Sequence, residues 1–161
     1  MNWNDIGKPL WRQRHSLIKL ELHTEPVELE QGPLAPLRGI GAHDLREAIS
    51  KMEKLRDLNL SASLVQGSVP YDPPYLPDMF PKRLERLTLH ENLDRAGPTY
   101  QAQAQSRLAF VESLLNDSSF EELECVTTSD YLALDPAAVE KHRWLVEPMA
   151  DDGYQEFYRN R

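Results

Sequence analysis

The stretch Leu55-Arg56-Asp57-Leu58-Asn59-Leu60 has the spacing L-x-x-L-x-L, which decides how the rest of the chain is interpreted. The same spacing recurs at residues 17–22 and 84–89, and a weaker copy, F-x-x-L-x-C, follows at residues 120–125. Self-similarity of this kind is typical of a protein built from repeated structural units.

The spacing has a direct physical meaning for an extended chain. Successive side chains of a strand point to opposite faces, so Leu58 and Leu60 share one face and Asn59 lies on the other. The segments between copies are too long for hairpins but can supply the crossovers that parallel strands need. We therefore predict parallel strands at 17–22, 55–60, 84–89 and 120–125, each beside the next in chain order.

Several of the connecting segments show helix signals. The segment 44–54 opens with a capping-box-like Asp44 and Glu47, and its apolar residues recur at helical spacing. A second helix is predicted at 99–115, and a last helix near 136–146, where Asp135-Pro136 resembles an N-cap followed by a proline. A short helical turn is expected at 9–14, with Leu10 and Trp11 facing inward.

The other segments are predicted to be loops or a tail. Glycine and proline are concentrated in residues 31–41 and 69–81, which disfavours helix and central strand there. We predict one α/β domain, residues 1–147, with about four strand units, and a loosely held polar C-terminal tail at 148–161. Repeats with this leucine spacing run about 20–29 residues. The expected architecture is therefore a short leucine-rich-repeat-like solenoid, with parallel strands and with helices on its convex side.

Composition restricts the class of partner and the compartment. The 161 residues carry a formal charge of −8, from 18 basic and 26 acidic residues. Nucleic acid and anionic membranes require a basic face, so neither is expected, and a protein partner remains. The single cysteine cannot form an intramolecular disulfide, which fits a reducing compartment. The sequence has no signal-peptide pattern and no apolar run near the roughly 20 residues of a membrane span. A cytoplasmic or nuclear location is expected.

No residue pattern typical of an enzyme stands out in the sequence. Cys125 occupies a strand-leucine position, so a small buried residue is expected there and not a nucleophile. His23 and His90 share a repeat position but lie two strands apart, roughly 10 Å between Cα atoms. We therefore expect solvent-facing histidines, no metal site, no cofactor and no enzyme activity. Two alternatives stay open: a small α/β hydrolase or metal-dependent enzyme, and a truncated fragment with no independent activity.

The exposed face of the predicted strands is the candidate site for a protein partner. Aligning the four copies gives a first row of Lys19, Asp57, Arg86 and Glu122, a second of Glu21, Asn59, Thr88 and Glu124, and a third of His23, Ser61, His90 and Val126. The first row alternates in sign, so its neighbours are expected to form exposed ion pairs. Tyr71 and Tyr75, in the proline-rich loop, either cover the edge of the sheet or serve as further anchors.

Two blocks of the chain, residues 52–67 (MEKLRDLNLSASLVQG) and 76–89 (LPDMFPKRLERLTL), together with the opening at 10–17, resemble the leucine-rich-repeat part of fungal F-box and F-box-like proteins. This resemblance, which covers roughly residues 6–126, implies the substrate-recognition arm of a cullin-type ubiquitin ligase. In that family the F-box is a helical module ahead of the repeats, and we find no such module in this sequence. A ligase adaptor is therefore an expected partner only if an F-box lies upstream.

Overall fold

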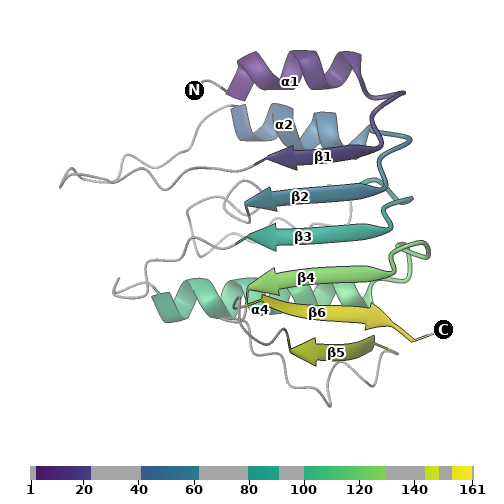
Figure 1. The fold of residues 1–161 in the computed structure, drawn as a ribbon. Coiled ribbons are helices and arrows are strands. Elements are labelled where there is room, and N and C mark those ends of the chain that lie inside the picture. Colours follow the sequence, from purple (N-terminus) through teal and green to yellow (C-terminus); the bar gives the residue numbers. More distant parts are fainter. Residues whose placement is uncertain are drawn as a thin grey trace.

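The computed structural model describes residues 3–22, 41–61, 80–90, 100–129, 144–148 and 154–160, which form a mixed α/β fold (Figure 1). The helices are α1 (Trp3–Arg12), α2 (Gly41–Ser50) and α4 (Tyr100–Asn116). The strands are β1 (Lys19–Leu22), β2 (Asp57–Ser61), β3 (Arg86–His90), β4 (Cys125–Ser129), β5 (Trp144–Pro148) and β6 (Tyr154–Arg159). All six strands belong to one sheet, in the order β1-β2-β3-β4-β6-β5.

The first four strands are parallel neighbours in chain order, as the leucine spacing predicted. Leu20 lies opposite Leu58, and Leu58 lies opposite Leu87. All three leucines are buried, because the alternation of side chains along each strand turns them to the same face. The prediction is confirmed for the copies at 17–22, 55–60 and 84–89.

The fourth copy lies three residues further along the chain than we predicted. Leu87 pairs with Val126, so the repeat in β4 is Leu123-x-x-Val126-x-Thr128 and not the copy at 120–125. Leu123, Val126 and Thr128 are fully buried, whereas Cys125 is only half-buried. The threonine in the last position of the observed copy made this copy hard to recognise in the sequence.

Helices are observed at or beside three of the four predicted places. α2 and α4 lie close to the predicted segments 44–54 and 99–115, and α1 is a full helix where only a short turn was expected. Leu10 packs on the core, but Trp11 is 40 % exposed, so its predicted inward orientation is wrong. The helix near 136–146 is wrong at its end, because Trp144–Pro148 forms β5. Residues 136–143, like Tyr71 and Tyr75, lie outside the described residues.

The chain beyond Glu147 returns into the sheet. β6 lies between β4 and β5 and runs antiparallel to both, with Phe157 opposite Val126 on one side and Val146 on the other. Phe157 is fully buried, so the expectation of a loosely held tail is wrong for Tyr154–Arg159. The charged residues of this segment made the alternation of inward-facing and outward-facing side chains hard to recognise in the sequence. The sheet is therefore mostly parallel, and the described residues establish an α/β fold without establishing a solenoid.

One hydrophobic cluster lies between the sheet and the helices. Leu45 of α2 and Phe110 of α4 belong to it together with the inward-facing strand residues, and Leu10 of α1 packs against it. Trp144 of β5 donates a hydrogen bond from Nε1 to the carbonyl oxygen of Leu115, at 2.9 Å, which joins β5 to the end of α4. The described helices therefore cover one face of the sheet, and the alternate strand residues form the other face, called the open face below.

Candidate binding surface

The open face carries the first predicted row across three strands. Lys19 lies opposite Asp57, and Asp57 lies opposite Arg86. Lys19 and Arg86 are exposed, and Asp57 is half-buried between them. In β4, however, the next position holds Cys125 and not Glu122. The predicted row is thus confirmed for three residues and wrong for the fourth, because of the three-residue difference in register.

The second row is displaced at the same strand. Glu21, Asn59 and Thr88 lie side by side as predicted, but Thr127 follows where Glu124 was expected. β6 and β5 extend both rows in a way that the sequence did not predict. They add Tyr158 and Leu145 to the first row and Glu156 and Glu147 to the second.

The third predicted row is not an exposed surface. Ser61 lies opposite His90, as predicted, but Ser61 is 2 % exposed and His90 is half-buried. Ser61 is the last residue of β2, an interior strand of the sheet. Val126 lies on the buried face. His23 falls outside the described residues, so its predicted exposure stays a prediction.

Lys19 pairs with a residue of its own strand and not with Asp57 on the neighbouring strand. Lys19 Nζ lies 2.7 Å from Glu21 Oε1, two residues along β1 on the same face. The hydrogen bond to Glu21, together with the charges of Glu21 and Asp57, raises the pKa of Lys19. All of Lys19, Asp57 and Arg86 are described, and neither of the two predicted pairs among them forms. Arg86 and Asp57 thus keep their charges available to another molecule.

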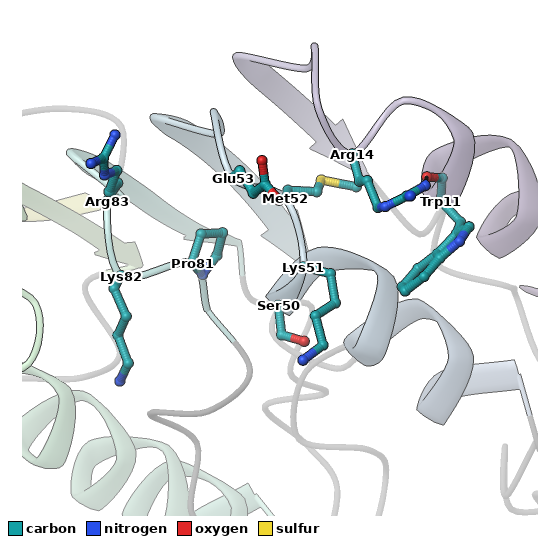
Figure 2. A pocket seen from close by; sticks show the side chains of 9 residues that line it. All are labelled: Trp11, Arg14, Ser50, Lys51, Met52, Glu53, Pro81, Lys82 and Arg83. Atoms are coloured by element: carbon teal, nitrogen blue, oxygen red, sulfur yellow. Dashed lines mark hydrogen bonds between the residues drawn. The ribbon is translucent and has the colours of Figure 1, made fainter.

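A pocket lies at the turns that precede the strands. It has a volume of about 560 Å³ and is open to solvent between the end of α2 and the turn before β3. Figure 2 shows Trp11 and Arg14 on one side of it, Lys82 and Arg83 on the other, and Lys51 between them. The leucine spacing did not predict this pocket, although basic residues at the helix-to-strand turns were a visible signal in the sequence.

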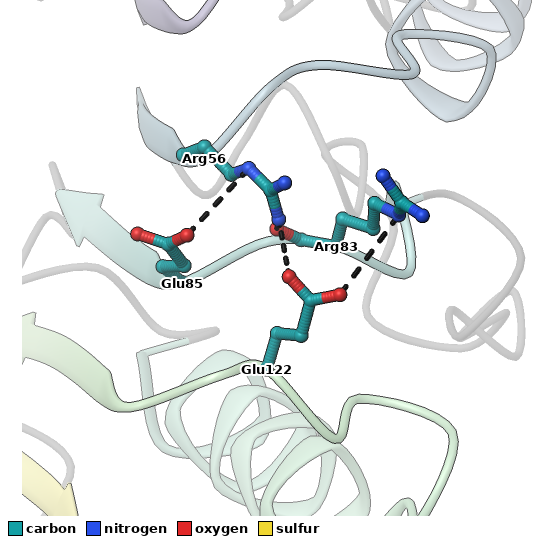
Figure 3. Close-up of polar contacts among 4 residues, drawn as sticks. All are labelled: Arg56, Arg83, Glu85 and Glu122. Carbon is teal, nitrogen blue, oxygen red and sulfur yellow. Dashed lines mark hydrogen bonds and ion pairs between the residues drawn. The ribbon is translucent and has the colours of Figure 1, made fainter.

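Next to this pocket, four charged residues form a cluster of ion pairs (Figure 3). Arg56 contacts Glu85, at 3.5 Å, and also Glu122. Arg83 lies 3.9 Å from Glu122. With the corrected register, Arg56 and Glu85 occupy equivalent repeat positions, as do Arg83 and Glu122. The predicted pair between Arg86 and Glu122 is therefore wrong, because Glu122 lies in the turn before β4.

The environment of Cys125 differs from the buried position predicted for it. Burial raises the pKa of the thiol, the nearby Glu156 acts in the same direction, and Arg86 opposes them. The thiol Sγ lies 3.9 Å from Thr127 Oγ1, within hydrogen-bond distance for sulfur. Within the described part of the chain, no group of three or more histidine, cysteine, aspartate or glutamate side chains is arranged to hold a metal ion.

Comparison of the chain with protein families, curated proteins and solved structures finds no match. Among the described helices, none is long and apolar enough to cross a membrane.

Proposed function

We propose that this protein is a protein-interaction module that binds its partner through the open face of the sheet. The observation that carries the proposal is the row Lys19–Asp57–Arg86, which brings residues from three distant parts of the sequence side by side. Charges on such a face select a partner of complementary charge and set the rate of encounter. Because two of these side chains are exposed, they can contact another chain without any rearrangement of the core.

The other half of the open face has a different chemical character. Beyond Arg86, the first row continues with Cys125 and Tyr158, and Leu145 follows on the edge strand, where it is 47 % exposed. Arginine and tyrosine are enriched among the residues that dominate the energetics of interfaces. A partner would thus meet charged residues over β1–β3 and a less charged, partly apolar strip over β4, β6 and β5.

The size of this face indicates how strong the binding can be. Six strands span roughly 24 Å, and five residues extend roughly 17 Å along a strand, so the face covers roughly 400 Å². A standard interface buries about 800 Å² on each partner. The open face alone therefore supports a weak or transient contact, and stable binding requires residues beyond the strands.

The finer form of the proposal is a leucine-rich-repeat-like substrate receptor of an F-box-type ubiquitin ligase. It is supported by the three leucine copies that lie in register in β1, β2 and β3 and by the sequence resemblance. A receptor of this kind needs an F-box on the same polypeptide, ahead of the repeats. Transcript sequence upstream of Met1 tests this part, and an open reading frame that reaches a stop codon without an F-box would contradict it.

The binding proposal is tested by exchanging the charges at the centre of the face. The variant Asp57→Arg/Arg86→Asp keeps the net charge and alters two side chains outside the core, so folding should change little. In affinity capture with quantitative mass spectrometry, we expect it to lose partners that the wild type retains. The matched control is Lys8→Asp/Glu47→Arg, the same exchange at exposed helix positions. Equal retention of every partner by both folded variants would contradict the proposal.

A further inference from the structure

The pocket at the strand-leading turns is a concentration of positive charge in an acidic protein. Its lining contains four basic side chains, Arg14, Lys51, Lys82 and Arg83, and one carboxylate, Glu53 (Figure 2). The whole chain carries a formal charge of −8. A local excess of this sign, opposite to that of the protein, attracts negatively charged groups over about one Debye length.

The pocket's own carboxylate does not cancel this excess. Glu53 is one carboxylate against four cations, and its Oε2 lies 3.1 Å from His15 Nδ1. The partial negative charge of about half a unit at the C-terminal end of α2 also falls short of four cations. That helix end nevertheless disfavours a small anion held deep in the pocket, and it favours a ligand whose negative charges are spread along the rim.

The basic side chains differ in how far they are already engaged. Lys82 donates a hydrogen bond to Ser119 Oγ at 2.7 Å and lies over the Phe120 ring, so it contributes mainly charge. Arg83 is 66 % exposed and lies 3.9 Å from Glu122, a carboxylate that also contacts Arg56. Lys51 is exposed and makes no hydrogen bond or ion pair with any described residue. Arg83 and Lys51 are therefore the cations that a ligand can reach most easily.

Arg14 is held ready for a contact by its neighbour Trp11. Its guanidinium lies 4.8 Å from the centre of the Trp11 ring and donates a hydrogen bond to the Trp11 carbonyl oxygen at 2.9 Å. A guanidinium has five N–H donors, so most of them remain for a ligand. Stacking on the ring fixes the plane of the group in advance, which reduces the entropy lost on binding.

We propose that this pocket binds an acidic peptide segment of a protein partner, whose carboxylates contact Arg14, Lys51 and Arg83. The turns before β1 and β3 are two strand spacings apart, roughly 10 Å. Carboxylates on alternate residues of an extended peptide are roughly 7 Å apart, so a short segment reaches two or three of these cations. A single inorganic anion is too small to do so. The site is separate from the open face, and either proposal can fail alone.

The test is a titration of a fluorescein-labelled hexaglutamate peptide, followed by fluorescence anisotropy at low salt. We expect Lys51→Glu/Arg83→Glu to weaken binding by at least about tenfold, because charges of one sign repel. The matched control, Lys8→Glu/Arg12→Glu, makes the same charge change at exposed positions of α1 and should weaken binding less than about twofold. Lys51→Gln, a milder change at an exposed residue, provides a second variant in case the reversal disturbs the Arg83–Glu122 pair.

Three results would overturn the proposal. One is equal weakening by both double variants, which would show attraction to the protein as a whole. Another is binding of neutral hexaglutamine as tight as that of hexaglutamate. A third is displacement of the peptide by inorganic phosphate when the phosphate supplies the same total negative charge as the peptide. Trp11→Ala removes the stacking partner of Arg14 and no charge. A roughly threefold loss of peptide affinity in this variant would support the role of Trp11 in positioning Arg14.

Discussion

Cys125 lies directly opposite Arg86 in the sheet. This pairing continues the row Lys19–Asp57–Arg86 into β4 and fixes the register of the fourth repeat copy. It also removes Glu122 from the row and places it in the preceding turn, where it contacts Arg56 and Arg83. The composition of the open face thus depends on a difference of three residues between two overlapping leucine-like patterns.

The register can be measured by a cross-link. Neighbouring Cα atoms on paired strands are roughly 5 Å apart, within the 4.4–6.8 Å that a disulfide requires. We therefore expect Arg86→Cys to form a disulfide with Cys125 under mild oxidation, detected by mass spectrometry as the loss of two free thiols. The comparison variant Arg86→Cys/Glu122→Cys/Cys125→Ser should stay reduced. The opposite pattern would show that the sheet has the register predicted from the sequence.

Truncating Leu58 tests the central leucine row. Leu58 is fully buried between Leu20 and Leu87, and removing such a side chain costs about 2–5 kcal/mol through lost transfer energy and the cavity left behind. We expect Leu58→Ala to lower the free energy of unfolding in urea by that amount. The control is Leu145→Ala, at a 47 % exposed position, which should change it far less. Equal effects would mean that Leu58 is not in the core.

Phe157→Ala tests the position of β6 between β4 and β5. Phe157 is fully buried opposite Val126 and Val146, so its loss should cost about 3–5 kcal/mol. Trp144 of β5 is hydrogen-bonded to Leu115 of α4, and its emission should move to longer wavelength at a lower urea concentration. Asn160→Ala, an exposed change just beyond β6, is the control. Unfolding of Phe157→Ala at the wild-type urea concentration would support the loosely held tail expected from composition.

The sequence predicted the parallel part of the sheet because its signal is periodic and repeated. Three copies of L-x-x-L-x-L place their leucines on one face, and the structure aligns Leu20, Leu58 and Leu87 accordingly. The sequence pattern did not predict the register of β4. Thr128 occupies a position where a leucine was expected, and Phe120 appeared to begin an alternative copy of the repeat. Hydrogen bonding between neighbouring strands decides which of two overlapping patterns is adopted. The sequence of one strand alone does not specify which residues of its neighbour it will pair with.

The C-terminal strands and the ion pairs could not be derived for related reasons. Phe157 stands in a stretch that also contains Glu156 and Arg159, so its segment resembles a polar tail until β4 and β5 are known to lie beside it. Lys19 pairs with Glu21 in its own strand, a choice of side-chain rotamer that row alignment does not predict. Arg83 and Glu122 would have been paired correctly if the register of β4 had been known.

The thiol of Cys125 should react slowly and only at high pH. Burial raises its pKa, so less thiolate is present at neutral pH than for an exposed cysteine. We expect the rate of alkylation by iodoacetamide to rise with pH through a midpoint above that of N-acetylcysteinamide. The folded state holds the thiol proton of Cys125 more tightly than the unfolded state does. Protonation of this thiol therefore stabilises the folded state at pH values below the pKa of the thiol in the unfolded chain. This stabilisation is lost as the pH rises through the folded pKa.

The control for this prediction is the reaction in denaturant, where the thiol should behave like N-acetylcysteinamide. A midpoint in the folded protein at or below that of the free thiol would contradict the half-buried environment described for Cys125.

The most direct measurement of the central proposal is a photo-cross-linking comparison between the two sides of the molecule. Thr88 lies in an interior strand on the open face, and Ser113 is an exposed residue of α4 on the helix-covered side. A photo-reactive phenylalanine analogue placed at each site should cross-link partner protein from Thr88 and much less from Ser113. Introducing Asp57→Arg/Arg86→Asp should abolish the Thr88 products. Partner cross-links that form mainly from Ser113, or from both sites alike, would contradict the assignment of the open face as the binding surface.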